Sequence, residues 1–294
     1  MPKVSIIMPT YNRAGILPTA IKSVLSQSYQ DWELLVVDNG STDNTRSVVE
    51  SIPDSRVHYI FNEHPTGSPA APRNLGIMRA KGEYIAFLDD DDIWYPEKLS
   101  RSVRALLDSP EAILVCHARN IVQNGRIVEQ KFYGPWTENM LERLLYEGNF
   151  LSLGGMTVKT HVIHQIGGFD LRKEYYGCED YDLCIRLAYL RKPFLFIDSI
   201  LDEFRITGFN ESLRDPYHPV RVAGLVRDHL IQYEGSSKLS SRGRERLALA
   251  HFQAGRSLHR ARKVSDALKQ YWLAMQCGYP GVKGIILQIL THLA

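Results

Sequence analysis

The stretch Ile85-Ala86-Phe87-Leu88-Asp89-Asp90-Asp91-Asp92 decides the fold of this chain. Its apolar half, which begins at Tyr84, is an unbroken run with β-branched and aromatic members. Such a run is typical of a strand buried on both faces of a parallel sheet. Four carboxylates follow at once, and Trp94 and Pro96 lead into the next helix. Because ligands of open α/β sheets bind at the carboxyl ends of the strands, the sequence predicts a dense negative charge at the ligand site.

The four aspartates have two chemical interpretations. Adjacent carboxylates repel one another, and a hard divalent cation such as Mg²⁺ or Mn²⁺ offsets that repulsion. These cations take oxygen ligands and are commonly shared with substrate phosphates. The alternative is a helix-entry cluster, because Asp is favoured at N-caps and in first turns. Under the metal interpretation, Asp92 is the member expected to serve only as a cap.

The charge is distributed unevenly along the 294 residues. Hydrophobic and charged fractions of 44% and 23% are those of an ordinary soluble protein, long enough for one large domain and an appendage. The net charge of +2 hides an asymmetry, because residues 221–294 hold 12 Lys/Arg and 4 Asp/Glu and carry +8, which leaves −6 for residues 1–220. A basic tail on an acidic body indicates an anionic partner for the tail.

Targeting signals are not expected in this sequence. The first apolar run, residues 4–8, is short and ends at Pro9, so no secretory signal is predicted. No stretch approaches the roughly 20 apolar residues that a membrane span needs. The four cysteines show neither a CxxC pair nor zinc-ligand spacing, and we expect them to be reduced and buried. These features predict a cytoplasmic protein.

Apolar patterns predict strands and helices that alternate along the first 90 residues. Strands are expected at residues 4–8, 33–37, 56–61 and 84–88, and helices at about 14–27, after Ser41 or Thr42, and around Arg73. This order predicts a doubly wound, mostly parallel sheet with helices on both faces. Neither GxGxxG nor GxxxxGK[ST] follows the first strand, so the dinucleotide and P-loop classes lose support.

Further strands are expected at residues 113–116, 154–159 and 194–197. The segment 121–128 predicts a hairpin with a type I′ turn at Asn124-Gly125. A tight turn is expected at Gly167-Gly168, and a helix is expected to begin at Glu179. Residues 220–294 read as mostly helical.

Six motifs occur in a characteristic order along residues 3 to about 212. They are Pro9-Thr10-Tyr11-Asn12; Val37-Asp38-Asn39-Gly40-Ser41-Thr42-Asp43; Arg73-Asn74-x-Gly76; Leu88 to Asp92 with Trp94 and Pro96; Gly167-Gly168-Phe169-Asp170; and Glu179-Asp180-x-Asp182-x-x-x-Arg186. Together they closely resemble the inverting, nucleotide-sugar-dependent glycosyltransferases of family 2, which have the GT-A fold. The resemblance implies a catalytic domain over residues 1–215, with a donor-binding half to about 110 and an acceptor-side half from about 111. A basic helical extension, 216–294, follows.

The resemblance assigns donor-binding roles by position. Asp89 and Asp91 would bind the ribose and a divalent metal, Mn²⁺ or Mg²⁺, which acts as a Lewis acid on the departing phosphate. Asp38 would accept a hydrogen bond from the base, usually uracil. Arginines suit phosphate by charge and bidentate geometry. The other positions expected at the donor site are Pro9, Thr10, Tyr11, Asn12, Arg13, Arg73, Asn74, Asp90 and Arg205.

Asp180 matches the family's general base, which takes the proton from the acceptor hydroxyl as that oxygen attacks the anomeric carbon. Direct displacement inverts the configuration, and positioning must supply much of the rate because a carboxylate is a weak base for a hydroxyl. Glu179 and Asp182 are the alternative acids, and all three also fit a helix start stabilised by the dipole. Gly168 and Glu179 are expected on the acceptor side.

One position departs from the family pattern. Many members have a metal-binding His in the segment that follows the last core strand, and here that segment reads Phe204-Arg205-Ile206-Thr207-Gly208-Phe209-Asn210-Glu211-Ser212. Thr207 stands at the His position. A hydroxyl is a poor substitute for imidazole as a ligand, so a metal held by carboxylate, phosphates and water is expected to bind more weakly.

Other conspicuous side chains are given ordinary roles. His161 and His164 lack a carboxylate pattern that would make a metal site, and they are expected at the surface or satisfied in the core. Trp136 and the pair Tyr175-Tyr176 could stack on an acceptor sugar, but loop packing explains them equally well.

The tail predicts a tetratricopeptide-like helix pair over residues 247–280, followed by a final apolar helix from about Gly281. One such pair cannot bury both of its faces, so it is expected to pack on the catalytic body or on a second subunit, as a homodimer. The basic tail could instead lie on an anionic membrane surface near a lipid-linked acceptor, as a peripheral contact at the inner face. A packing helix with a solvated basic face is the alternative.

The leading hypothesis is a metal-dependent inverting glycosyltransferase. It would move a hexose or N-acetylhexosamine from a donor, expected to be UDP-linked, to a glycan, lipid-linked or protein acceptor in cell-surface polysaccharide, glycolipid or glycoprotein glycan synthesis. A non-catalytic nucleotide-sugar-binding or scaffold protein of the same fold is the alternative. A sugar-phosphate nucleotidyltransferase would need a glycine-rich basic loop where Pro9 to Arg13 stands. No nucleic-acid partner is expected, because the tail contains no recognised module.

Overall fold

The computed structural model describes residues 3–208, 210 and 214–293, which form two compact units. The first unit comprises the described residues of Met1–Met140, Asn149–Asp170 and Leu183–Phe209. The second comprises those of Leu141–Gly148, Leu171–Asp182 and Asn210–Ala294. Of the segment that follows the last core strand, Phe209, Glu211 and Ser212 lie outside the described residues.

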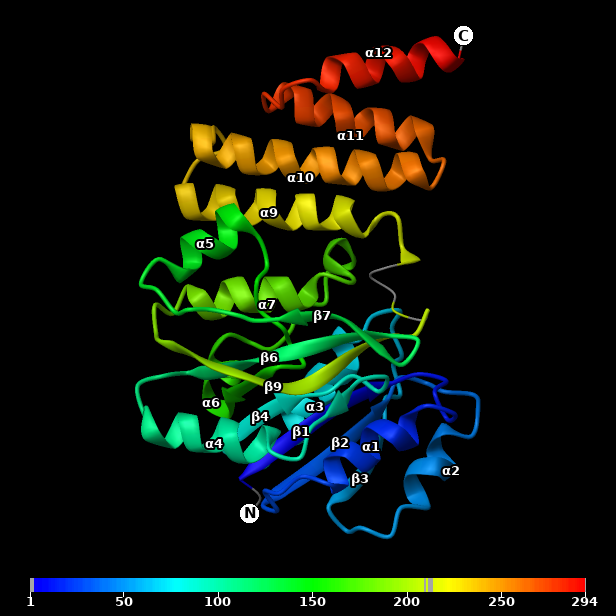
Figure 1. The fold of residues 1–294 in the computed structure, drawn as a ribbon, viewed down its shortest axis with the longest axis vertical. Coiled ribbons are helices and arrows are strands. Elements are labelled where there is room, and N and C mark those ends of the chain that lie inside the picture. Colours follow the sequence, from blue (N-terminus) through cyan, green and yellow to red (C-terminus); the bar gives the residue numbers. More distant parts are fainter. Residues whose placement is uncertain (1–2, 209, 211–213, 294) are drawn as a thin grey trace. The chain divides into compact units, whose positions relative to one another are not determined.

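The elements follow one another as the apolar pattern predicts over the first half of the chain (Figure 1). The strands are β1 (Val4–Thr10), β2 (Trp32–Asp38), β3 (Val57–Phe61), β4 (Tyr84–Phe87), β5 (Ile93–Trp94), β6 (Leu114–Gln123), β7 (Arg126–Lys131), β8 (Met156–Lys159) and β9 (Phe194–Ile206). The helices are α1 (Leu17–Leu25), α2 (Thr45–Glu50), α3 (Ala70–Arg79), α4 (Lys98–Asp108), α5 (Met140–Glu147), α6 (Thr160–Gln165), α7 (Glu179–Ala188), α9 (His218–Glu234), α10 (Ser241–Arg260), α11 (Val264–Gln276) and α12 (Val282–Leu293), with a 3₁₀ turn at Lys173–Tyr175.

The first unit is built on one mixed sheet of nine described strands in the order β3-β2-β1-β4-β8-β6-β9-β5, with β7 paired to β6. Strands β3, β2, β1 and β4 are parallel, and β8 then pairs antiparallel with both β4 and β6. The chain order reverses between β1 and β4, since β2 lies on one side of β1 and β4 on the other. Such a switch point is where open α/β sheets bind ligands.

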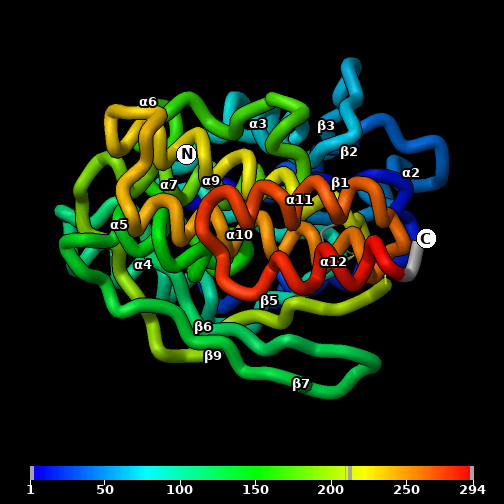
Figure 2. The backbone as a smooth tube through the Cα atoms, turned by 90° about the horizontal axis from the view of Figure 1, so that it is seen from above, coloured from blue at the N-terminus to red at the C-terminus, as the bar shows by residue number. Residues whose placement is uncertain are grey.

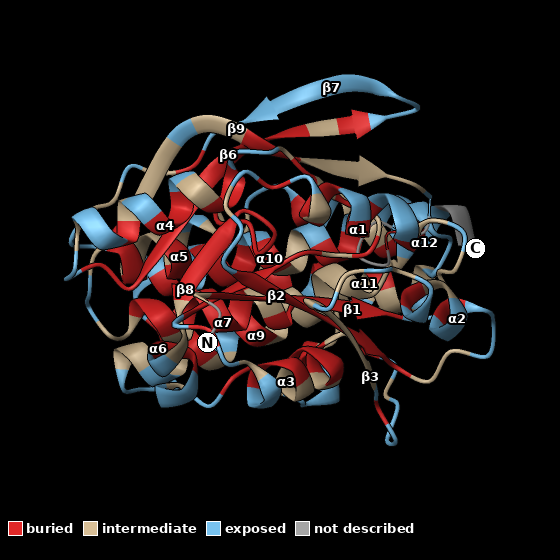
Figure 3. Ribbon diagram, turned by 90° about the horizontal axis from the view of Figure 1, so that it is seen from below, coloured by how far each residue is buried: buried red, intermediate tan, exposed pale blue. Residues whose placement is uncertain are grey.

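The central strands are buried because their residues are apolar on both faces. Every residue of β1, β2 and β4 is buried, and helices cover them (Figure 3). A core cluster joins α1, through Leu17, Ile21 and Val24, to the strands and to Leu99 and Val103 of α4. Gly76 of α3 lets that helix approach β1, because a Cβ there would lie 2.6 Å from Ile7. The predicted doubly wound architecture is confirmed for this unit.

Two strands are longer than the apolar pattern predicts. β6 continues through His117 and Arg119 to residue 123, and β9 continues from 197 to Ile206. The predicted turn at Asn124-Gly125 is confirmed, with φ values of 51° and 72°. It joins β6 to β7, whose residues are all exposed and which lies at the margin of the sheet (Figure 2). The short strand β5 was not predicted.

The second unit is helical. α10 packs against α9 and α11, and α11 packs against α12, so the helices are stacked in chain order (Figure 1). α9 and α12 therefore flank the predicted tetratricopeptide-like pair within the unit itself. A small apolar cluster around Leu258, Ala267 and Tyr271 forms its core. No helix among the described residues is both long enough and apolar enough to cross a bilayer.

Candidate active site

Aspartates gather where three parallel strands of the first unit end. Asp38 is the last residue of β2 and pairs in register with Thr10, the last residue of β1. The run Asp89 to Asp92 follows β4, which is the other neighbour of β1. The structure thus brings the predicted donor-site positions of three motifs to one edge of the sheet, beside the switch point.

The first two aspartates of the run have different partners. Asp89 is the more exposed, with a side chain 39% accessible, and Nη2 of the buried Arg73 lies 2.7 Å from its Oδ1. Asp90 is buried and accepts a hydrogen bond of 2.6 Å from Thr10 Oγ1, and Arg13 Nε lies 3.9 Å from it. Burial, with repulsion from its neighbours, raises the pKa of Asp90 to about 7. Asp90 is therefore only partly ionised near neutral pH.

Asp91 is half-buried, and Thr207 Oγ1 lies 3.3 Å from its Oδ2. Burial, and then repulsion from Asp89, raises the pKa of Asp91. A cation between the two carboxylates would relieve that repulsion. Thr207 therefore contacts the expected metal ligand itself.

Asp92 is bound into the interior of the first unit. Its Oδ2 accepts from Arg119 Nη2 at 2.9 Å and its Oδ1 from the backbone N–H of Arg205 at 3.0 Å. The next helix, α4, begins at Lys98, and its N-cap position is Glu97. The expectation that Asp92 caps this helix is therefore wrong, because the carboxylate turns inward to a buried arginine instead.

Arg119 is the centre of a buried charge cluster that the apolar pattern did not reveal. It donates 2.7 Å to Asp202 and 2.6 Å to Ser152 as well as to Asp92. Lys98, fully buried, donates to Thr157 Oγ1 at 2.8 Å. The only signal in the sequence was that a histidine at position 117 and charged residues at positions 119 and 202 interrupt apolar runs.

Asp38, the residue expected to recognise the base, is buried. Its Oδ1 accepts from the Ser41 backbone N–H at 2.8 Å and its Oδ2 from Tyr59 at 2.7 Å. Each carboxylate oxygen can accept a second hydrogen bond, so a base could still be recognised. Ser41 therefore belongs to the Asp38 turn and does not cap α2, whose N-cap position is Asn44.

Asn12 joins the loops that follow β1 and β2. Its Oδ1 accepts from the backbone N–H groups of Thr42 and Asp43, and its own N–H donates 2.8 Å to Ser41. It adopts φ 53°, a left-handed conformation that Asn tolerates better than most residues. The preceding Tyr11 is exposed and so is free to face a ligand, while Pro9 is buried within β1.

Asn74 has a structural partner in the first unit. Its Nδ2 donates to the Phe169 carbonyl and its Oδ1 accepts from the Phe169 N–H, both at 2.8 Å. Gly168 has φ 72°, and a Cβ there would lie 2.6 Å from Asn74 Oδ1. Two motifs that lie far apart in the sequence are thus one contact.

The acids at the start of α7 lie in the second unit and differ in exposure. Asp182 is buried and lies 2.9 Å from His229 Nε2 of α9. Glu179 is buried and accepts from the Gly177 backbone N–H at 2.7 Å. Asp180 alone is half-buried, and it accepts from the Tyr181 N–H. Of the three, Asp180 is the most accessible to solvent, and its role as general base stays a prediction.

The remaining candidates have ordinary environments. His161 and His164 are exposed on α6. Tyr175 is buried, with its hydroxyl 3.2 Å from Asp228, so it packs rather than stacks on a sugar. Trp136 is half-buried.

The donor set suits a metal that is shared with substrate. In the part of the chain that the structure describes, no three or more His, Cys, Asp or Glu residues group as metal ligands. Asp89 and Asp91 offer two carboxylates, which matches the few protein ligands that Mg²⁺ takes beside phosphates and waters. These residues therefore fit Mn²⁺ or Mg²⁺ bound together with a diphosphate.

Comparison with known proteins decides the family. The sequence profile of Glycosyl transferase family 2 matches residues 5–169, more than half of the chain. The chain belongs to glycosyltransferase family 2. A relative from Escherichia coli, UDP-Glc:alpha-D-GlcNAc-diphosphoundecaprenol beta-1,3-glucosyltransferase WfgD, is 42% identical over 132 residues, which are 45% of this chain and 51% of WfgD. The chain thus spans only about half the length of this curated relative.

Solved structures share the GT-A fold. S. aureus TarS 1-349 in complex with UDP-GlcNAc superimposes with a TM-score of 0.70 at 20% identity, over 97% of this chain and 84% of TarS. The mannosyltransferase PcManGT from Pyrobaculum calidifontis, in complex with GDP-Man and Mn²⁺, gives a TM-score of 0.60 at 18% identity, over 98% and 79%. The predicted GT-A-like fold with a helical extension is confirmed.

Proposed function

We propose that this family 2 protein is an inverting glycosyltransferase that moves a sugar from a UDP-linked donor to a hydroxyl of a lipid-linked glycan acceptor. The observation that carries the proposal is the placement of Asp38, Asp89 and Asp91 at the shared edge of β2, β1 and β4. WfgD is named for its UDP-glucose donor and TarS is solved in complex with UDP-GlcNAc, and both support a uridine donor. The acceptor named for WfgD, a diphosphoundecaprenol carrier, supports a lipid-linked acceptor.

In this proposal the residues at the strand ends bind and orient the donor. Asp38 accepts from the base, and Tyr11 and Asn12 border the nucleoside. Asp89 and Asp91 hold Mn²⁺ or Mg²⁺, which supplies Lewis-acid stabilisation of the leaving diphosphate when bound. Arg73, already paired with Asp89, and Arg205 add positive charge near the phosphates.

The acceptor is activated by Asp180. The acceptor hydroxyl gives its proton to the Asp180 carboxylate while its oxygen forms the bond to the anomeric carbon. The bond from that carbon to the diphosphate breaks at the same time, and its electron pair leaves with the phosphate oxygen. One displacement inverts the configuration, and no covalent enzyme intermediate forms. Gly168 and Glu179 are assigned to the acceptor side through the turn and helix start that they shape.

The basic tail is assigned to the membrane. Its +8 charge would hold the protein peripherally on an anionic lipid surface, where a lipid-linked acceptor resides. Flotation with phosphatidylglycerol vesicles, and not with phosphatidylcholine vesicles, is the expected result. A protein that stays in the soluble fraction with both would remove this part of the proposal.

The test of the reaction is a transfer assay with stereochemical readout. UDP-glucose, UDP-GlcNAc and GDP-mannose are each offered with Mn²⁺, Mg²⁺ or EDTA and a diphosphate-linked GlcNAc acceptor. A UDP-sugar is expected to be consumed only with metal, and ¹H NMR is expected to show the inverted anomer. A product with retained anomeric configuration would contradict direct displacement. Full activity in EDTA would contradict the requirement for a divalent metal.

A further inference from the structure

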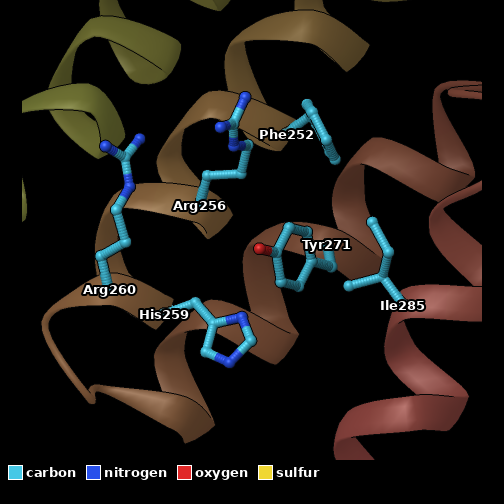
Figure 4. A pocket seen from close by; sticks show the side chains of 6 residues that line it. All are labelled: Phe252, Arg256, His259, Arg260, Tyr271 and Ile285. Atoms are coloured by element: carbon cyan, nitrogen blue, oxygen red, sulfur yellow. The ribbon is translucent and has the colours of Figure 1, made fainter.

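The second unit contains a pocket of about 440 Å³ among α10, α11 and α12 (Figure 4). The pocket is lined by basic side chains, aromatic rings and one aliphatic side chain. They are Phe252, Arg256, His259, Arg260, Tyr271 and Ile285. Nothing in the proposed transferase chemistry uses any of them.

The two arginines of the pocket lack acidic partners. Among the described residues, no carboxylate lies within ion-pair distance of Arg256 or Arg260, and both are exposed. Arg221 of α9, in the same unit, instead pairs with Asp215, and Arg227 with Asp228. Two adjacent cations without acids repel one another, and an anionic ligand would relieve that repulsion.

Tyr271 places a polar atom in the pocket. The residue is only 2% exposed, yet no described residue hydrogen-bonds to its hydroxyl. Figure 4 shows that hydroxyl on the side of Arg256 and Arg260. Burial raises the pKa of the Tyr271 hydroxyl, and the positive charges of Arg256 and Arg260 partly offset that rise. Gly255 makes room for the ring, because a Cβ there would lie 2.6 Å from it. The hydroxyl is not one of the buried polar atoms that lack a partner, so water reaches it, and a ligand in the pocket would take the place of that water.

The positions of the basic side chains in the pocket are only partly explained by helix stability. His259 and Arg260 lie in the last turn of α10, where cations interact favourably with the helix dipole. Arg256 lies one turn earlier, and the dipole does not account for the Tyr271 hydroxyl. The apolar lining is Phe252, one turn before Arg256 on α10 and 5.9 Å from the centre of its guanidinium, and Ile285 of α12.

We propose that this pocket binds a phosphate or diphosphate group joined to an apolar chain. Arg256 and Arg260 hold the phosphate oxygens, Tyr271 donates its hydroxyl hydrogen, and Phe252 and Ile285 contact the first carbons of the chain. The lipid-linked acceptor of the proposed function has this chemistry, and the inference rests on that function for its biological source.

Binding is measured by calorimetry with farnesyl diphosphate below its micelle concentration, in EDTA and without donor sugar. Inorganic diphosphate and farnesol are the comparison ligands. Farnesyl diphosphate is expected to bind at least about tenfold more tightly than either. Arg256→Gln with Arg260→Gln is expected to weaken it at least about tenfold, and Tyr271→Phe, which removes one hydroxyl, about threefold or more.

The matched control is Lys238→Gln with Arg242→Gln, which removes the same charge from the loop before α10 and from the first turn of that helix. It is expected to leave affinity within about twofold. Equal losses in the two double variants would overturn the site. If farnesol binds as tightly as farnesyl diphosphate, the pocket does not recognise the phosphate group. If inorganic diphosphate binds as tightly, the pocket does not recognise the apolar chain. The assay needs no sugar transfer, so its failure and a failure of the transferase proposal are separate results.

Discussion

Arg119 Nη2 lies 2.9 Å from Asp92 Oδ2, and both side chains are buried in the first unit. Asp92, the last aspartate of the run, is therefore the ion-pair partner of the buried Arg119, although the run as a whole resembles a metal-binding motif. Asp92 also accepts from the backbone of Arg205, while Thr207 contacts Asp91. The aspartate loop and the end of β9 are thus fixed together through adjacent carboxylates.

Removing the buried cation is expected to destabilise the protein strongly. Arg119→Met leaves Asp92 and Asp202 buried without their shared partner, which costs about 3–5 kcal/mol in the free energy of unfolding. Urea unfolding measures this loss. Arg101→Met, on the exposed face of α4 where Arg101 pairs with Glu97, is the control and should change stability by less than about 1 kcal/mol. Equal losses in the two variants would contradict a structural role for Arg119.

Adjacent aspartates are expected to respond differently to the same change. Asp91→Asn should weaken Mn²⁺-dependent UDP binding about tenfold or more, because a carboxylate ligand becomes a neutral amide. Asp92→Asn should lower stability first, because Arg119 loses a charged partner. Calorimetry with UDP and Mn²⁺, beside urea unfolding, separates the two. Unchanged nucleotide affinity in Asp91→Asn would count against the metal site.

Thr207 gives a gain-of-affinity test. Thr207→His places an imidazole beside Asp91, and the Mn²⁺ affinity measured by electron paramagnetic resonance with UDP present is expected to increase about tenfold. Thr207→Val removes only a long hydrogen bond of 3.3 Å and should weaken Mn²⁺ binding by less than about threefold. If Thr207→His leaves the Mn²⁺ affinity unchanged, the ion does not bind beside Asp91.

Asp180→Asn is expected to lower the rate of transfer by about 10²–10⁴ with donor affinity unchanged, because the base is lost but no donor contact is. Glu179→Gln should act mainly on stability, because its carboxylate accepts from the Gly177 N–H. Initial rates and UDP-sugar affinity are measured for both. Normal turnover in Asp180→Asn would show that another group removes the proton.

Lys98 is expected to make stability depend on pH. Burial lowers its pKa from 10.5 to about 7 in the folded protein. From about pH 7 to 10.5 the unfolded chain binds a proton that the folded chain does not. The free energy of unfolding should therefore rise with pH, by up to about 1.4 kcal/mol per unit.

Urea unfolding at pH 7.0 and 8.5 measures the Lys98 effect below the range where the raised pKa of Cys116 acts in the opposite direction. Lys98→Met should flatten the dependence. The same slope in both proteins would assign it to another group.

The sequence allowed prediction of the elements whose burial follows from apolar residues. β1, β2 and β4 have apolar residues on both faces, and Asn124-Gly125 permits only a few turn types. β9 was predicted only over the apolar run that ends at residue 197, and Asp202 and Arg205 lie beyond that run. In the structure Arg119 pairs with the buried side chain of Asp202, and Asp92 accepts from the backbone N–H of Arg205, so β9 continues past the apolar run. Partners separated by 83 and 113 residues leave no local pattern.

The residues of the candidate site also differ in how far the sequence predicted them. Asp38 and Asp89 were placed correctly at strand ends, since the direction of each strand follows from the order of elements. That Asp92 turns inward and Asp91 does not is decided by what β6 and β9 present beneath the loop. The common location of Asp180 and the aspartate loop stays a prediction.

The amide of Asn74 engages both main-chain groups of Phe169, which means that it recognises the backbone there and ignores the side chain. Substitution at 169 is consequently tolerated by this contact, whatever its effect on packing. The contact does not tolerate substitution at position 74. An aspartate there cannot donate a hydrogen bond to the Phe169 carbonyl, and a glutamine is one carbon too long. Gly168 is constrained by the same amide. Natural variants of this chain should therefore change 74 and 168 only as a pair, while residue 169 is constrained by its packing on Phe87 and not by the amide.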